Sequence, residues 1–201
     1  YPNWKHIPIA YHGRASSIVV SGTPIYRPQG QFKPADSPNP VFGVTKELDF
    51  ELEIGAIIGR NTEHGKSIST AEAEDYVFGL VLFNDWSARD IQRWETLPLG
   101  PFLGKNFASS ISPWVVTLEA LEAFRVQGPT QDPQPLPYLQ VEGIRNFDIQ
   151  LMVKLNETTI TNTNFKYMYW NIAQQVAHHT VNGCNLKIGD ILASGTISGS
   201  E

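Results

Sequence analysis

The chain has 201 residues, 41% hydrophobic and 17% charged, a balance that allows a buried core and excludes a disordered chain. Its 16 glycines and 14 prolines disfavour a helical bundle, and a net charge of −5 without a basic stretch argues against nucleic acid or an anionic membrane as partner. The lone Cys184 excludes an internal disulfide framework and a cysteine-based zinc site. We expect one domain of mixed β structure with a few helices (α+β), in a reducing compartment.

Two β segments are predicted before residue 55. The β-branched run at 17–20 predicts a short strand between turns. Residues 48–54 alternate strictly between apolar and polar, as expected for a strand with one buried face. Since successive strand side chains point to opposite faces, Asp49, Glu51 and Glu53 should share the polar face.

A helical turn and a buried strand are predicted next. Residues 69–74 begin with Ser69 and carry acids in the first turns, a pattern typical of a capped helix start. The continuous apolar run 76–83 predicts a strand buried on both faces. A helix should follow, capped near Asp85 or Ser87 and ending before Pro98.

The second half of the chain begins with a proline-rich loop at 127–137. Alternation predicts a strand over 147–156, and the polar segment 158–163 is either its hairpin return or a loop. Apolar positions at helical spacing predict a helix from a cap near residue 163 to beyond 176. A last strand is expected at 190–193.

The acidic face of 48–54 is the first candidate site. Neighbouring carboxylates there should lie about 7 Å apart and repel one another, unless a hard cation such as Ca²⁺ or Mg²⁺ binds between them. Asp85 ends a predicted buried strand and is the natural third ligand. The alternatives are a solvated strand face for Glu51 and Glu53, and a helix N-cap for Asp85.

The helix after Asp85 carries the second candidate group. Arg89 and Gln92 lie at positions i and i+3 and should point from one face, where a guanidinium and an amide could stabilise an oxyanion. Lys105 follows a tight apolar loop that would restrict its amine. The alternatives are a surface ion pair between Arg89 and Asp85 and a solvated Lys105.

Five ordered segments together resemble the fumarylacetoacetate hydrolase family, and the resemblance covers the whole chain. They are YHGRASSIVVSGTP (11–24), LDFELE (48–53), NDWSARDIQ (84–92), PLGPFLGK (98–105) and LASGTISG (192–199). The family implies a β-roll or sandwich-like catalytic domain, of which residues 1–201 would form about the first two thirds, without the SH3-like domain that precedes it. It also implies a homodimer in the cytoplasm.

The resemblance also implies roles for individual residues. Metal ligands would be Glu51, Glu53, Asp85, Lys105 and Ser109, catalytic residues Arg89, Gln92 and Lys105, and substrate-binding residues Tyr11, Gln92, Thr96 and Thr196. Lys105 could bind a metal only through its carbonyl. Ser109 replaces the family's usual Thr, and Thr96 replaces a common Tyr. The implied cofactor is a divalent cation, Ca²⁺ and/or Mg²⁺.

The implied reaction is metal-dependent hydrolysis of the carbon–carbon bond of 4-fumarylacetoacetate, a diketo acid, to fumarate and acetoacetate. This is the last step of tyrosine and phenylalanine catabolism. The family's catalytic His and its Glu partner would lie outside this chain, so we expect the 201 residues to be inactive alone. The alternatives are an acylpyruvate hydrolase, decarboxylase or isomerase of the same superfamily, and a non-catalytic cation-binding β module.

Overall fold

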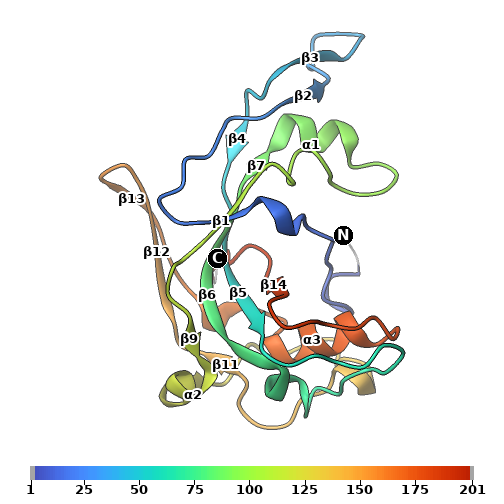
Figure 1. Ribbon diagram of the computed structural model, residues 1–201, viewed down its shortest axis with the longest axis vertical. Coiled ribbons are helices and arrows are strands. Elements are labelled where there is room, and N and C mark those ends of the chain that lie inside the picture. Colours follow the sequence, from blue (N-terminus) through green and yellow to red (C-terminus); the bar gives the residue numbers. More distant parts are fainter. Residues whose placement is uncertain (1–2, 200–201) are drawn as a thin grey trace. The chain divides into compact units, whose positions relative to one another are not determined.

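The computed structural model describes residues 3–199, and it confirms the predicted mixed α+β fold class with few, short helices (Figure 1). In chain order the elements are η1 (Ala15–Ser17), β1 (Ile18–Val20), β2 (Gln29–Phe32), β3 (Val41–Val44), β4 (Leu48–Asp49), β5 (Leu52–Ile58), η2 (Ala73–Tyr76), β6 (Val77–Asp85), β7 (Ser87–Ala88), α1 (Arg89–Glu95), β8 (Ser109–Ile111), β9 (Val116–Thr117), α2 (Leu118–Leu121), η3 (Glu122–Phe124), β10 (Arg125–Val126), η4 (Pro137–Leu139), β11 (Asn146–Phe147), β12 (Gln150–Leu155), β13 (Thr158–Asn164), η5 (Phe165–Tyr167), α3 (Ile172–Thr180) and β14 (Ile191–Ala193). Within residues 3–199, no helix has both the length and the apolar character needed to cross a bilayer.

The chain divides into two compact units. Unit 1 comprises Tyr1–Ile9, Ile54–Val81 and Trp114–Glu201, and unit 2 comprises Ala10–Glu53 and Leu82–Pro113. The division falls inside β5 and β6, so each of these strands contributes residues to both units.

Unit 2 is built around the last residues of β6. Strand β8 pairs antiparallel with this end of β6, which sets Asp85 opposite Ser109, and β1 pairs parallel with β8. Strands β4 and β7 form a short antiparallel pair in which Asp49 lies opposite Ser87. These pairings bring the chain near residue 50 to the place where β6 ends.

Helix α1 packs on the hairpin of β2 and β3 (Figure 1). Their small core consists of Phe32, Ala88 and Ile91, with Phe107 packed against it. Gly30 allows the close approach, because a Cβ there would lie 2.7 Å from Cδ1 of Ile91. The core fixes where the polar side of α1 lies in this unit.

The start of α1 differs from the prediction. Its N-cap is Ala88, which makes no side-chain cap, so a cap at Asp85 or Ser87 is wrong. Both residues belong to strands, and the Ser87 hydroxyl donates to the carbonyl of Asp85. The first turn is stabilised instead by Asp90, which accepts hydrogen bonds from the N–H groups of Ile91 and Lys46.

The β6 segment is not buried on both faces as predicted. The side chains of Phe78 and Leu82 are 55% and 50% exposed, whereas Leu80 and Val81 are buried. The uninterrupted apolar run therefore does not signal burial on both faces.

Unit 1 contains the hairpin of β12 and β13 and the helix α3. The hairpin confirms that the polar segment after residue 157 is a returning strand. Helix α3 begins later than expected, because β13 and η5 occupy the residues up to Tyr167. Its N-cap is Asn171, whose side-chain oxygen accepts a hydrogen bond from the N–H of Gln174. The side-chain oxygen of Gln174 in turn accepts from the N–H of Asn171, which completes a capping box.

The Asp90 contacts give a prediction about stability. Burial alone would raise the pKa of this carboxyl, but hydrogen bonds from the Thr45 hydroxyl and from the N–H groups of Lys46 and Ile91 hold it below its usual value. The ionised Asp90 carboxylate therefore contributes fully to the free energy of unfolding above its unfolded-state pKa of about 4. This contribution is lost as the pH falls through the lower folded-state pKa.

In the intact protein, Asp90→Asn should lower the free energy of unfolding at pH 7 by about 1–3 kcal/mol. Denaturant unfolding at pH 7 and pH 3 should show a smaller difference at the lower pH. The exposed Asp75 supplies the control, because Asp75→Asn should leave the free energy within about 0.5 kcal/mol of wild type. Equal stability of Asp90→Asn and wild type at pH 7 would refute the role given to these bonds.

Candidate functional site

Residues 48–54 do not form the single uninterrupted strand that their alternation predicts. Strand β4 ends at Asp49 and β5 begins at Leu52. Between them the N–H of Glu51 donates to Oδ1 of Asn84 (3.2 Å), and its carbonyl accepts from the N–H of Asp85 (3.2 Å). The break thus attaches the backbone of Glu51 to the end of β6.

Glu51, Glu53 and Asp85 come together as predicted. One carboxylate oxygen from each lies within 4.8 Å of the other two. Glu53 and Asp85 are 3% and 6% exposed, so the alternative of a solvated acidic face is wrong. Glu51 is partly buried, and three carboxylates this close repel strongly unless cations lie among them.

Two basic side chains lie against these acids. Nζ of the buried Lys105 is 2.7 Å from Oε1 of Glu51 and 3.1 Å from Oδ2 of Asp85. The alternative of a solvated Lys105 is therefore wrong. Arg89 donates from Nη1 to Oε1 of Glu51 (2.7 Å) and from Nε to Oδ2 of Asp49 (2.8 Å).

Carboxylates are concentrated in this cluster. In the described part of the chain, Arg89 and Lys105 pair with Glu51 and Asp85, and the half-exposed Asp49 adds another acid beside Arg89. A divalent cation would add positive charge among Glu51, Glu53 and Asp85, and carboxylate oxygens are the ligands that Ca²⁺ and Mg²⁺ prefer. The residues present therefore fit a hard divalent cation.

The pKa values of the site residues reflect burial and the neighbouring charges. Burial raises the pKa of Asp85, and the hydrogen bond from Tyr11 and the charge of Lys105 offset only part of the rise. Burial would also raise the pKa of Glu51, but hydrogen bonds and charges from Lys105 and then Arg89 hold it below its usual value. Burial, the bond to Asp85 and the nearby acidic charges raise the pKa of Tyr11, which keeps it a neutral donor near pH 7.

A cavity of about 450 Å³ opens beside these residues, within unit 2. Four predicted site residues line it, namely Tyr11, Asp85, Lys105 and Ser109. Ser109 lies directly opposite Asp85 in the pairing of β8 with β6. The cavity thus gives a small molecule access to the acidic cluster.

Arg89 and Gln92 are neighbours on α1 as expected, but their contacts differ from the prediction. Arg89 pairs with Asp49 and Glu51, so a surface pair with Asp85 is wrong. Its Nη1 also donates to Oε1 of Gln92 (3.1 Å), which turns the Gln92 amide nitrogen away from Arg89. The two Nη2 hydrogens take no part in these three bonds.

Thr96 and Thr196 are the remaining predicted substrate residues. The Thr96 hydroxyl donates to the backbone carbonyl of Gln92 (2.5 Å) at the end of α1, and Thr96 does not line the 450 Å³ cavity. Thr196 lies in unit 1, in the exposed segment after β14. Their contacts with a substrate remain predictions.

Three residues around the site were not assigned a role from the sequence. Asp49 lies on the predicted acidic face, but its binding of Arg89 could not be read from spacing. Asn84 holds the backbone of Glu51, and Glu95 accepts hydrogen bonds from the loop before Lys105. No sequence pattern identifies the last two, because both bind backbone N–H groups, which every residue except proline carries.

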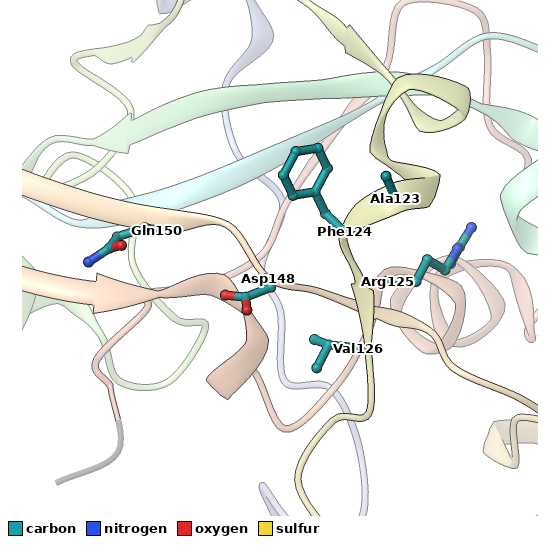
Figure 2. Close-up of a pocket in the computed structure, with 6 residues that line it drawn as sticks. All are labelled: Ala123, Phe124, Arg125, Val126, Asp148 and Gln150. Carbon is teal, nitrogen blue, oxygen red and sulfur yellow. The ribbon is translucent and has the colours of Figure 1, made fainter.

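A second cavity, of about 360 Å³, lies in unit 1 between η3, β10 and the start of β12 (Figure 2). In Figure 2 the Arg125 side chain points away from Asp148. Arg125 pairs with Glu74 and Glu122, and Asp148 accepts hydrogen bonds from Asn164 and Lys166. These charged groups are already neutralised, so this cavity is a weaker candidate.

Comparison with known proteins gives consistent matches. The family model described as fumarylacetoacetate (FAA) hydrolase C-terminal matches residues 1–201. Fumarylacetoacetases of Arabidopsis thaliana and Bos taurus are 59% and 58% identical over 206 residues, which cover 100% of this chain and 49% of each protein. The solved fumarylacetoacetate hydrolase of Exiguobacterium antarcticum has a TM-score of 0.58 at 25% identity, over 92% of this chain and 52% of that chain. This chain thus spans about half the length of these relatives.

The acidic cluster predicts tight divalent-ion binding that depends on Glu53. Glu53→Gln in the intact protein should weaken Mg²⁺ or Ca²⁺ binding about tenfold or more, because it removes one of the carboxylate charges. Titration calorimetry measures this effect. Glu63→Gln removes an equal charge from an exposed ion pair with Lys66 and should leave the affinity unchanged. Equal affinities for Glu53→Gln and wild type would show that Glu53 does not bind the ion.

Proposed function

The chain belongs to the fumarylacetoacetate hydrolase C-terminal family, and from this premise we propose that the intact protein hydrolyses 4-fumarylacetoacetate to fumarate and acetoacetate. This reaction would be the last step of tyrosine and phenylalanine catabolism. The observation that supports the proposal most strongly is the largely buried group of Glu51, Glu53 and Asp85, with Lys105 against it, beside an open cavity.

We assign cation binding to Glu51, Glu53 and Asp85. A bound Ca²⁺ or Mg²⁺ would supply positive charge for the two oxygens of a 1,3-diketone and for the carbanion that leaves when the carbon–carbon bond breaks. Ser109 lies beside Asp85 on the neighbouring strand and is a further candidate ligand through its hydroxyl. Lys105 could contribute only its carbonyl, because its ammonium faces the acids.

We assign oxyanion stabilisation to Arg89, Gln92 and Lys105. When water attacks a carbonyl carbon, negative charge develops on the oxygen, and donors already fixed in place stabilise it. The three hydrogen bonds of Arg89 use Nε and Nη1, so its Nη2 hydrogens could donate to the oxyanion. Gln92 accepts through Oε1, so its amide nitrogen could donate as well. The Lys105 ammonium binds Glu51 and Asp85 with two of its three hydrogens, and the third could donate to the oxyanion.

Other parts of the proposal rest on the family resemblance. Tyr11 would bind the substrate through its neutral hydroxyl, and Thr96 and Thr196 are further candidate contacts. Activation of the attacking water falls to a His and its Glu partner outside these residues. A homodimer, a cytoplasmic location and the assignment of residues 1–201 to the first part of one β-roll domain belong to the same proposal.

Product analysis of the intact protein tests the reaction. Incubation with fumarylacetoacetate should release fumarate and acetoacetate, and a chelator should abolish turnover until Mg²⁺ or Ca²⁺ is restored. Acylpyruvates, tested in parallel, should react much more slowly. Faster turnover of an acylpyruvate would favour the related hydrolase, and activity unaffected by chelation would refute the metal-dependent reaction.

Substitution of Arg89 separates a catalytic role from a structural one. Arg89→Ala should lower kcat about a hundredfold while bound metal persists, because the oxyanion contact is made in the transition state. Arg89→Lys should have a kcat only slightly above that of Arg89→Ala, since one ammonium cannot span Asp49, Glu51 and an oxyanion. Arg93, which forms an exposed ion pair with Glu47 on the same helix, gives the control Arg93→Ala. Near-normal turnover in Arg89→Ala would leave this residue only a structural role.

A further inference from the structure

The carboxylate of Glu95 is bound by three consecutive backbone N–H groups. Oε1 accepts from Phe102 (2.7 Å) and Gly104 (2.8 Å), and Oε2 accepts from Leu103 (3.0 Å). Glu95 is the last residue of α1, so these bonds attach the loop 102–104 to the end of that helix. Hydrogen bonds to a charged acceptor are among the stronger ones in proteins.

Packing alone does not hold this loop. The side chains of Phe102 and Leu103 are 64% and 44% exposed, so they contribute little burial. Gly104 lies directly against α1, where a Cβ would come within 2.7 Å of the backbone nitrogen of Gln92. The Gly104 carbonyl accepts from the N–H of Ala88 (2.8 Å). The loop is therefore held to α1 mainly by polar backbone contacts, of which Glu95 supplies three.

The position of this loop determines where the ammonium of Lys105 lies. Lys105 follows Gly104 directly, and its N–H donates to the carbonyl of Phe102 (3.1 Å). Its side chain is 4% exposed, with Nζ at hydrogen-bond distance from both Glu51 and Asp85. A shift of about 1 Å in a reacting group can cost about a hundredfold in rate, so precise placement of this ammonium matters.

We propose that Glu95 is a positioning residue for Lys105, holding the loop 102–104 so that the ammonium stays between Glu51 and Asp85. This inference rests on the proposed function, because Lys105 is assigned there to oxyanion stabilisation. Arg89, Gln92 and Glu95 are spaced three residues apart on α1. One short helix thus carries two groups that act directly and one that acts through the loop.

Chemical labelling of Lys105 tests the placement without any need for activity. The intact protein, stripped of metal, is treated with a limiting amount of acetic anhydride, and acetylation of each lysine is followed by mass spectrometry. Glu95→Gln should increase acetylation of Lys105 several-fold while the other lysines react as in wild type. Glu47→Gln, an acid-to-amide change on the exposed partner of Arg93, should change nothing.

Kinetics test whether Glu95 acts through Lys105. Glu95→Gln should lower kcat about tenfold with little change in KM, because it weakens the hold on the loop and leaves the cavity itself in place. In a Lys105→Met background, the same substitution should lower kcat less than twofold, since the group it positions is gone. Glu95→Asp should also have a lower kcat than wild type, because the shorter side chain of aspartate cannot reach all three N–H groups.

Three outcomes would overturn the inference. Wild-type labelling of Lys105 in Glu95→Gln would show that the loop does not depend on this carboxylate. Equal effects of Glu95→Gln in both backgrounds would show that it acts independently of Lys105. A uniform rise in the labelling of every lysine would indicate general unfolding, not local positioning. Absence of fumarylacetoacetate hydrolysis in wild type would refute the proposed function alone, because the labelling result still decides the placement.

Discussion

The buried ammonium of Lys105, placed between Glu51 and Asp85, is the interaction on which the candidate site depends. Without it, Glu51 and Asp85 would lose the cation that they share, and Glu51 would keep its pair with the Arg89 guanidinium. Removing one partner of a buried ion pair typically costs about 3–5 kcal/mol, because the remaining charge is left unpaired. The acids could then stay close only by taking up protons or another cation.

The scaffold of unit 2 places this ammonium by several independent constraints. The pairing of β8 with β6 sets Ser109 opposite Asp85, and the backbone of Glu51 is bound to the end of β6. Helix α1 is fixed by its apolar contacts with the β2–β3 hairpin, which leaves its polar side for the site. The same helix binds the acids directly through Arg89 and the Lys105 loop through Glu95. Helix position and charge balance are therefore coupled.

The sequence predicts those features of the site that depend on local patterns. Alternation places Glu51 and Glu53 on one face, and a strand that ends at Asp85 supplies the third acid. It does not predict the break after Asp49, because that break reflects contacts with residues more than 30 positions away. The partners of Arg89 are missed for the same reason, since a helix-local pair with Asp85 is the simplest expectation from spacing.

Other differences follow from competition between local preferences. Asp85 and Ser87 are residue types that suit a helix cap, but both are paired in strands, and α1 starts at Arg89. The apolar spacing that suggests a helix from about residue 163 continues into α3, yet pairing with β12 keeps the chain extended up to Asn164. In both cases tertiary pairing overrides a signal that would suffice in isolation.

The acidic cluster of unit 2 differs from the structural ion-pair network of unit 1. In unit 1, Glu74 and Glu122 pair with Arg125 and Arg145, so two acids meet two bases and no net charge remains. In unit 2 one carboxylate oxygen from each of Glu51, Glu53 and Asp85 lies within 4.8 Å of the other two, and burial still raises the pKa of Asp85 despite the contact with Lys105. A network that served only stability would gain by balancing its charges, since each unpaired buried charge is costly. Three carboxylates held this close beside an open cavity therefore favour a site for a divalent cation.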